Sequence, residues 1–242
     1  MIDLSRVTSW TIPVGGVQRD VRRVSIGGVT IWTQPNPLPY VMDGLIAWYD
    51  GIWNAGIGVH DGTATTWTNL VDGDTVALGP YMEFAADGVR CTSERTTGII
   101  TGIAASGIHC IEAVGDLDRV TSPTFYVLSS QQKTIIPYVG TETLLTNNSR
   151  GMSVSLLGLH SVSVNYGSIA ESAHVDGQAV AVGTSARNIS SGSFQGVVRI
   201  GGRYSANLGA TGTYHCIRVY NRQLTVAEVA ANYAADRERF GI

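Results

Sequence analysis

The chain has 242 residues, a formal net charge of −3, 14% charged residues and 29 glycines. This length suits one β-sandwich with a small additional segment, because all-β sandwiches often run to roughly 200–250 residues as single domains. The low charge and many glycines are typical of a turn-rich β protein and exclude a helical bundle or a disordered chain. The negative net charge gives no electrostatic footprint for nucleic acid, so we expect no such partner.

The chain begins with a short segment, residues 1–34, that we expect to consist of β-strands. Strands are predicted over residues 9–12, 17–25 and 29–33, separated by Gly-Gly turns. About thirty residues cannot form an independent core, so this segment must dock on its own body, on a second copy or on another protein. The apolar side chains that we expect to anchor it are Val17, Val21, Ile31 and Trp32.

A proline-rich stretch, residues 35–41, is predicted to be a linker to the main body. The N-terminus lacks a basic region followed by an apolar run, so we expect no signal peptide and synthesis in the cytoplasm. No stretch approaches the ~18 apolar residues of a membrane span, so we expect no membrane insertion. Cys110 and Cys216 lie in apolar strand patterns and are predicted to be buried thiols.

The main body, residues 42–242, is predicted to be a series of short strands separated by turns. The expected strands are residues 45–49, 65–70, 81–85, 89–92, 107–117, 125–129, 133–139, 152–157, 161–166, 197–200 and 214–220. Short strands, regular turns and little helix signal together indicate a sandwich or a barrel.

Two local motifs stand out in the second half of the body. Residues 174–180 predict a hairpin, because the pair Asp176-Gly177 suits a type I′ turn. Thr225 precedes Glu228 by three residues, which is a capping box and predicts the start of a helix. The apolar residues that then recur at helical spacing are Val226, Val229, Ala230, Tyr233 and Ala234.

The closing stretch resembles a recurrent ending of laminin G-like domains. In that family a final strand with an I-R-V-Y pattern is followed by an N-R-x-L-[ST]-x-x-E turn into a short helix. The matching residues here are Ile217, Arg218, Val219, Tyr220, Asn221, Arg222, Leu224, Thr225 and Glu228. The resemblance implies an all-β, antiparallel jelly-roll β-sandwich of the concanavalin A-like kind over residues 42–242, with a short N-terminal β segment and one short C-terminal helix.

Residues 18–24 and 28–32 are similar to short leaders on bacteriophage and prophage structural proteins. This resemblance implies a virion structural protein, such as a head decoration, head fibre or tail-associated protein, whose sandwich binds host-surface glycans. The expected location is then the virion, and the expected partners are other virion proteins and further copies of the chain. The alternative is a free carbohydrate-binding module or lectin.

Glycan binding has candidate residues in the predicted loops. Sugars stack on exposed Trp or Tyr rings and are oriented by Asn, Asp and Arg. The candidates are Trp53, Asn54, Trp67, Tyr138, Asn147, Arg150, Arg203, Tyr204 and Asn207. We expect no cofactor; the alternative is calcium, for which Asp72 and Asp74 supply hard oxygen ligands.

A glycoside hydrolase of the same fold is a third hypothesis, and the sequence disfavours it. The best catalytic candidate is Glu112, with Asp116 and Asp118 further along the same strand. Even spacing places these three carboxylates on one face, which we expect to be the polar outer face of a half-buried strand. The middle position of the usual E-x-D-x-x-E motif is Val114, and no second glutamate follows. We therefore expect a protein that is not an enzyme.

Overall fold

The structure is a computed structural model whose contacts divide the chain into two compact units, Met1–Tyr40 and Val41–Ile242. It describes residues 11–14, 17–20, 23–26, 29–33, 40–93, 95–119, 128–129, 134–137, 143–144, 150–167, 170–184, 197–202 and 211–242.

The described residues of the first unit form two antiparallel hairpins. Strand β1 (Thr11–Val14) pairs with β2 (Val17–Asp20), and β3 (Arg23–Ile26) pairs with β4 (Val29–Thr33). The hairpins are separate two-stranded sheets. The prediction of one strand over residues 17–25 is therefore wrong, since this stretch is divided between β2 and β3. Its alternation fits one long strand or two short ones, and periodicity alone cannot tell which partner each part takes.

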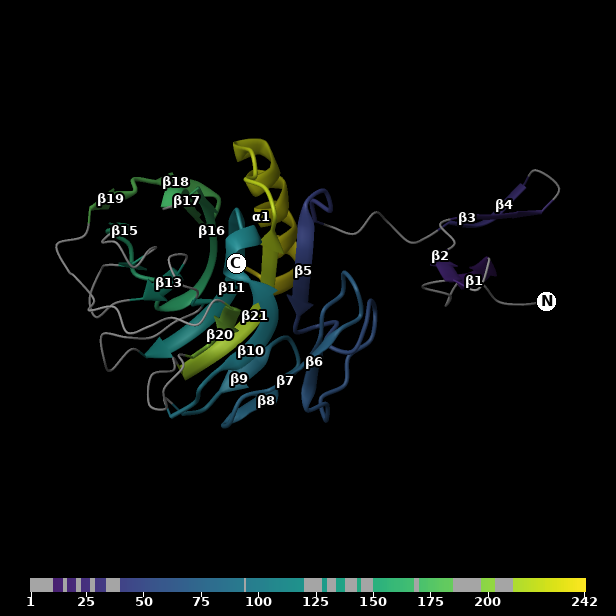
Figure 1. Cartoon of the computed structure of the whole chain (residues 1–242), viewed down its shortest axis with the longest axis horizontal. Helices are drawn as coiled ribbons and strands as arrows, with labels where there is room; N and C mark the ends of the chain where they lie inside the picture. Colours follow the sequence, from purple (N-terminus) through teal and green to yellow (C-terminus); the bar gives the residue numbers. More distant parts are fainter. Residues whose placement is uncertain are drawn as a thin grey trace. The chain divides into compact units, whose positions relative to one another are not determined.

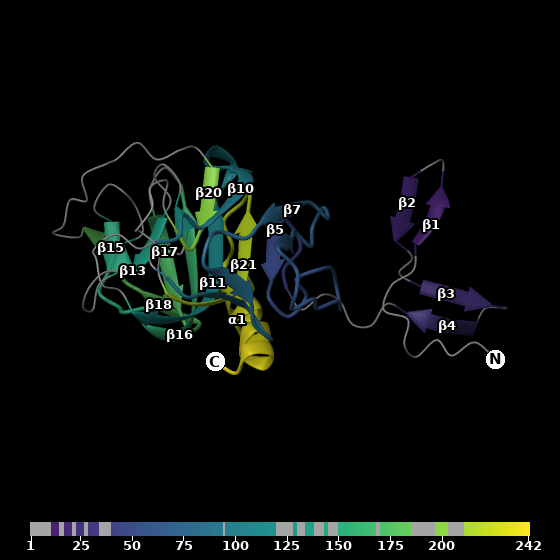
Figure 2. The same cartoon turned by 90° about the horizontal axis from the view of Figure 1, so that it is seen from below.

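The second unit is built on an eight-stranded sheet in the order β18-β17-β16-β11-β21-β9-β8, with β5 also paired to β21 (Figures 1 and 2). Its strands are β5 (Leu45–Asp50), β8 (Met82–Phe84), β9 (Val89–Cys91), β11 (Cys110–Arg119), β16 (Gly158–Tyr166), β17 (Ala170–Val175), β18 (Gln178–Val180) and β21 (Thr211–Tyr220). All pairings in this sheet are antiparallel.

The second layer is a seven-stranded sheet in the order β10-β20-β12-β13-β14-β15-β19. Its strands are β10 (Ile99–Ala104), β12 (Leu128–Ser129), β13 (Thr134–Pro137), β14 (Thr143–Leu144), β15 (Arg150–Met152), β19 (Gly183–Thr184) and β20 (Val197–Ile200). A small hairpin, β6 (Thr66–Thr68) with β7 (Thr75–Ala77), and a 3₁₀ turn, η1 (Ala105–Gly107), complete the β part.

One hydrophobic core lies between the two layers. It contains Ile111 and Val219 from the eight-stranded sheet and Ile135 and Val198 from the other, all essentially without solvent exposure. Residues two apart on a strand share a face, so the alternation of apolar residues along β11 and β21 is what places them inside. The predicted antiparallel β-sandwich with one C-terminal helix is confirmed.

The C-terminal helix, α1 (Val226–Phe240), begins at the predicted capping box. The Thr225 hydroxyl accepts from the Glu228 backbone N–H at 3.3 Å, and the Glu228 carboxylate accepts from the Thr225 N–H at 2.8 Å. The predicted hairpin is also confirmed, since Asp176 and Gly177 both have positive φ, at 49° and 72°. Buried thiols at Cys110 and Cys216 are confirmed as well.

Some strand predictions fail. Residues 153–157 are not a strand, because β15 ends at Met152. In this irregular segment Leu156 is buried and Leu157 is exposed, so an apolar residue packs into the core here without being part of a strand. Strands β7, β10, β14 and β19 were not predicted. Strand β10 pairs with β20, about a hundred positions further along the sequence, which no local pattern indicates.

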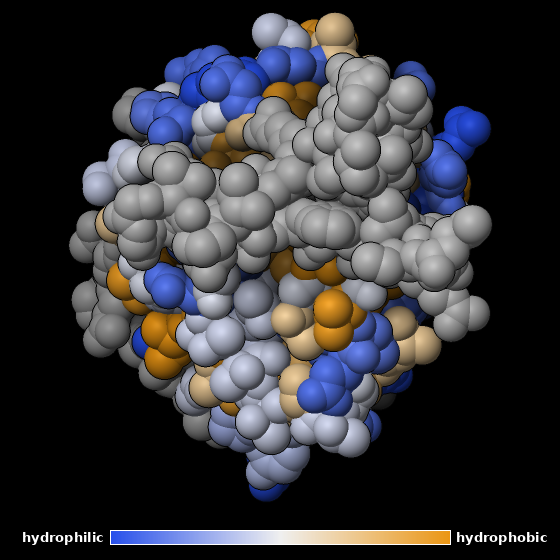
Figure 3. Space-filling model, turned by 90° about the vertical axis from the view of Figure 1, so that its right-hand side faces the viewer, coloured by the Kyte–Doolittle hydropathy of each residue, from blue (hydrophilic) through white to orange (hydrophobic). Residues whose placement is uncertain are grey.

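The surface of the described residues is mixed in character. In the face shown in Figure 3, hydrophobic atoms lie in small separate groups among polar ones. Isolated exposed apolar side chains are normal for soluble proteins. Among the described residues, no helix combines the length and the apolar character needed to cross a bilayer.

Candidate functional site

Helix α1 covers the outer face of the eight-stranded sheet and buries a network of ions there. Arg218 on β21 donates from Nε to Glu112 Oε2 at 2.9 Å and from both terminal nitrogens to Asp236 at 2.7 Å each. Asp236, on α1, also accepts from the Ser161 hydroxyl at 3.0 Å. Asn232 Nδ2 donates to the same oxygen of Glu112 at 2.7 Å. Every charged group in this network is thereby paired.

This network corrects the expectation for Glu112. The side chain is 3% exposed, so it does not lie on a half-buried outer face. Burial raises the pKa of Glu112, and the neighbouring Arg218 cation opposes that rise. Asp118 is engaged elsewhere, in an exposed ion pair with Arg90 at 2.6 Å. The strand pattern could not reveal that a helix nearly 120 residues away covers this face.

A second polar cluster holds the loop after β5. Asp50 Oδ1 accepts from the backbone N–H groups of Ile52 and Trp53, each at 3.0 Å, and Oδ2 accepts from Arg239 at 2.7 Å. The Arg239 guanidinium lies 4.1 Å from the centre of the Trp53 ring. Trp53 also contacts Trp48, with ring centres 5.7 Å apart. Trp53 is therefore only partly exposed and already stacked against its own chain.

Two predicted sugar contacts beside this loop are buried and cannot present a face to a ligand. Trp67 has no solvent exposure; its indole donates to the Asp50 carbonyl at 3.0 Å, and its ring packs on Tyr49 and Phe84. Asn54 is equally buried and closes a loop by bonding both ways with the backbone of Asp61, at 2.7 Å each. Both residues have structural roles. The side chain of Trp67 on β6 points into the core, and the amide of Asn54 is hydrogen-bonded to the loop backbone.

The remaining predicted sites are only partly described. Arg150 is the first residue of β15, and Val17, Ile31 and Trp32 lie on strands β2 and β4, where only the backbone is described. The predictions that fall outside the described residues are Tyr138, Asn147, Arg203, Tyr204, Asn207 and Val21.

The two calcium candidates lie in an exposed turn before β7. The Asp74 backbone N–H donates to Asp72 Oδ1 at 2.9 Å, which is an ordinary turn contact. Within the described ranges no three His, Cys, Asp or Glu side chains are grouped to share a metal ion. Burial, followed by the charges of Asp72 and Asp74, raises the pKa of Tyr49 to about 12.

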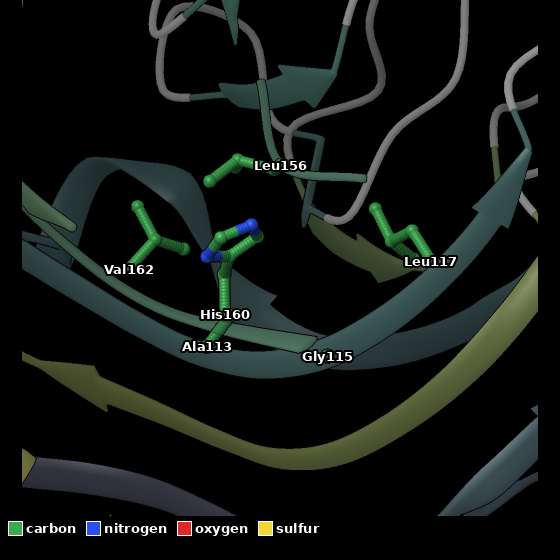
Figure 4. A pocket seen from close by; sticks show the side chains of 6 residues that line it. All are labelled: Ala113, Gly115, Leu117, Leu156, His160 and Val162. Atoms are coloured by element: carbon green, nitrogen blue, oxygen red, sulfur yellow. The ribbon is translucent and has the colours of Figure 1, made fainter. Parts of the chain in front are cut away.

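A small, partly open pocket lies on the inner face of β11 and β16 (Figure 4). Its lining residues are Ala113, Gly115, Leu117, Leu156, His160 and Val162. Figure 4 shows the imidazole of His160 projecting into the space between Leu156 and Leu117. The pocket has a volume of about 10 Å³, room for about one water molecule, and its apolar walls belong to the core, so His160 is its partly exposed polar group.

The hairpin turn orients this histidine. His160 Nδ1 lies 2.8 Å from Asp176 Oδ2, and the other carboxylate oxygen accepts from the Ser161 N–H at 2.9 Å. Because a carboxylate only accepts, Nδ1 carries the proton in this contact, and Nε2 is the ring nitrogen left for another partner. Both side chains are about one-third exposed, at 29% and 33%. A ring nitrogen held in place in this way can form a hydrogen bond with a ligand hydroxyl.

The sequence did not single out this pair, although it predicted the hairpin that supplies Asp176. The missing information was the pairing of β17 with β16, which brings Asp176 beside Ser161 and His160. That register depends on contacts between strands and leaves no local signal at His160 itself.

The sequence matches no protein-family model and no curated protein. The fold is similar to a Trypanosoma rangeli sialidase in complex with a difluoro-KDN ligand, with a TM-score of 0.54 and 16% identity over 88% of this chain and 35% of that one. It is also similar to domain 4 of AbnA, a GH43 extracellular arabinanase from Geobacillus stearothermophilus, in complex with arabinotriose. That TM-score is 0.50, with 16% identity over 78% of this chain and 98% of that one. The chain spans about a third of the sialidase chain it matches.

Proposed function

We propose that the unit Val41–Ile242 is a carbohydrate-binding domain. The observation that carries this proposal is the similarity of its sandwich to nearly the whole of arabinanase domain 4, a structure in complex with arabinotriose. This favours the free carbohydrate-binding module, which the sequence left as the alternative. The sialidase that is similar over about a third of its chain is in complex with a sugar acid.

The partly exposed His160, rather than the water-sized pocket beside it, is the proposed point of contact with the sugar. Its Nε2 suits a sugar hydroxyl, whereas Leu117, Leu156 and Val162 belong to the core and are each only 3% exposed. Asp176 holds the imidazole in place before the ligand arrives, so little ordering cost falls on binding.

We further propose binding without hydrolysis. A retaining glycosidase needs two carboxyl groups about 5–5.5 Å apart that flank the bond to be cleaved. Among the described residues, the candidate Glu112 is sealed beneath α1, and Asp118 is paired with Arg90. This is physical support for the absence of glycosidase chemistry at these two carboxylates.

The virion hypothesis and the anchoring role of residues 1–34 stay predictions. Neither structural similarity concerns a phage protein. The two-stranded hairpins of the first unit agree with a segment that needs a partner, because an isolated hairpin is marginally stable at best. Incorporation of the chain into particles, with and without residues 1–34, tests that hypothesis separately from sugar binding.

The test of sugar binding is a glycan array carrying plant, bacterial and animal oligosaccharides, with arabinotriose among them. We expect wild-type protein to bind a defined subset. His160→Ala should weaken that binding by about three- to tenfold, as the loss of one hydrogen bond predicts. The matched control is His60→Ala, since His60 is an exposed histidine whose Nδ1 contacts the Gly51 carbonyl far along the chain from the pocket. Absence of binding to every glycan would overturn the proposal.

A further inference from the structure

One turn of the sandwich holds a bulky residue in a backbone conformation that favours glycine. The turn is Gly79-Pro80-Tyr81-Met82, closed by the Met82 N–H donating to the Gly79 carbonyl at 3.2 Å. The φ angle of Tyr81 is +63°. Proline fixes a negative φ at the second position of a turn, so a positive φ at the third makes this a type II turn. Glycine or asparagine is the residue expected at that third position, and an aromatic residue there is strained.

The turn is fixed on both sides, so the base of the Tyr81 side chain cannot drift. The Tyr81 carbonyl accepts from the Thr92 backbone N–H at 3.0 Å and from the Thr92 hydroxyl at 3.3 Å. Gly79 packs against the backbone of Gly98, where an added Cβ would lie 2.7 Å from the carbonyl oxygen. These hydrogen bonds and this close packing therefore hold the backbone of Tyr81 in place before any ligand binds.

Packing within the described chain does not explain the aromatic residue. Tyr81 is 54% exposed and immediately precedes β8, the last strand in the order of the eight-stranded sheet. In the described part of the chain, neither a hydrogen bond nor a ring contact engages its phenol group. Strained backbone conformations cluster at ligand-binding sites, where the required side chain outweighs the conformational cost.

We propose that Tyr81 is a platform on which the CH face of a sugar ring stacks. The inference rests on the proposed sugar-binding function and adds a second contact, at the opposite edge of the eight-stranded sheet from β16 and β17. Exposed Glu83 and Thr92, close to the turn, offer hydrogen-bonding groups for sugar hydroxyls.

The charges near Tyr81 favour a neutral sugar over an anionic one. Glu83 pairs in register with Arg90, but the Arg90 guanidinium is already bound to Asp118 and lies 3.4 Å from the Thr213 hydroxyl. Glu83 is therefore left as an exposed negative group two residues from the platform. A neutral oligosaccharide, such as arabinotriose, is the class of ligand expected here.

The experiment compares wild type with Tyr81→Phe, Tyr81→Ala and Tyr81→Gly on the same glycan array, with arabinotriose as the soluble probe for titration. Tyr81→Phe keeps the ring and should bind within about twofold of wild type. Tyr81→Ala and Tyr81→Gly should each weaken binding to neutral glycans by about five- to tenfold, as the loss of an aromatic stacking partner predicts. The surface control is Val59→Ala, which shortens a side chain that is 51% exposed.

The two truncations separate binding from folding. Glycine tolerates the positive φ and alanine does not, so Tyr81→Gly should melt about 2–4 °C above Tyr81→Ala. Equal loss of binding in two variants of unequal stability would support the platform. Wild-type binding that Tyr81→Ala leaves unchanged would overturn this inference while the proposed function stands. Loss of binding only to anionic glycans would overturn the neutral class, and no binding by wild type would overturn both proposals.

Discussion

The two faces of the eight-stranded sheet are buried by different chemistry. On β21, Ile217 and Val219 point into the apolar core between the layers, while Arg218 between them points under α1 into ions and hydrogen bonds. All three are almost completely buried, at 0%, 0% and 1% exposure. Burial therefore does not imply apolar contact. The stability of the inner face depends on the apolar area that is buried and on close packing, whereas that of the outer face depends on each buried charge having an opposite charge beside it.

The largest expected effect comes from removing the central cation of the outer face. Arg218→Met leaves Glu112 and Asp236 buried without a countercharge, which should lower the free energy of unfolding by about 3–5 kcal/mol. Urea denaturation at pH 7 measures this value. A midpoint equal to that of wild type would show that the network contributes nothing to stability.

The stability of the same variant should also depend on pH, which compares the two faces further. Burial already raises the pKa of Glu112, and loss of Arg218 raises it further. A carboxyl whose pKa is higher in the folded than in the unfolded protein destabilises the fold when it is ionised. This destabilisation is lost as the pH falls and the carboxyl becomes protonated. The deficit of Arg218→Met should thus be smaller at pH 4 than at pH 8. The triple change Glu112→Leu, Arg218→Met and Asp236→Leu, which removes all three charges, should recover most of the loss.

A smaller effect is expected from the neighbouring position on the inner face. Ile217→Val removes one methylene from the core and should cost about 0.5–1.5 kcal/mol. Because no titrating group is involved, the cost measured by urea denaturation should be the same at pH 4 and pH 8. A marked pH dependence would mean that the two faces are coupled.

The smallest effect concerns the N-terminus of α1, the helix that covers the outer face. Hydrogen bonds from Arg222, and then from the Thr225 N–H, lower the pKa of Glu228 from 4.5 to about 2. A lowered carboxyl pKa stabilises the fold above the unfolded value and loses that contribution as pH falls from about 4.5 towards 2.

Glu228→Gln should therefore cost about 0.5–1 kcal/mol at pH 7, and the difference from wild type should vanish near pH 2. Thermal melts of both proteins across this range measure it. Glu238→Gln, a change to an exposed carboxylate near the other end of α1, is the matched control and should show no such convergence.

Sequence alone determined the features that a few neighbouring residues decide. The Asp176-Gly177 turn needs positive φ at two successive positions, and the Thr225–Glu228 box needs a hydroxyl and a carboxylate three residues apart. The alternation around Ile217 and Val219 identified a strand with one apolar face, because side chains point to opposite sides of a strand in turn. These rules indicated a sandwich or a barrel and the C-terminal helix, and the resemblance to laminin G-like domains implied the antiparallel sandwich.

Tertiary structure decided what covers each face and which groups remain exposed. Glu112 contacts Arg218 and, on α1, Asn232, which lie 106 and 120 positions further along the sequence. The pattern of its own strand therefore cannot reveal that Glu112 is buried. Trp67 and Asn54 have the composition of a sugar site and became part of the core, whereas His160 and Tyr81 showed no local signal of a site. Solvent exposure is set by packing between distant segments, and a local pattern carries no record of that packing.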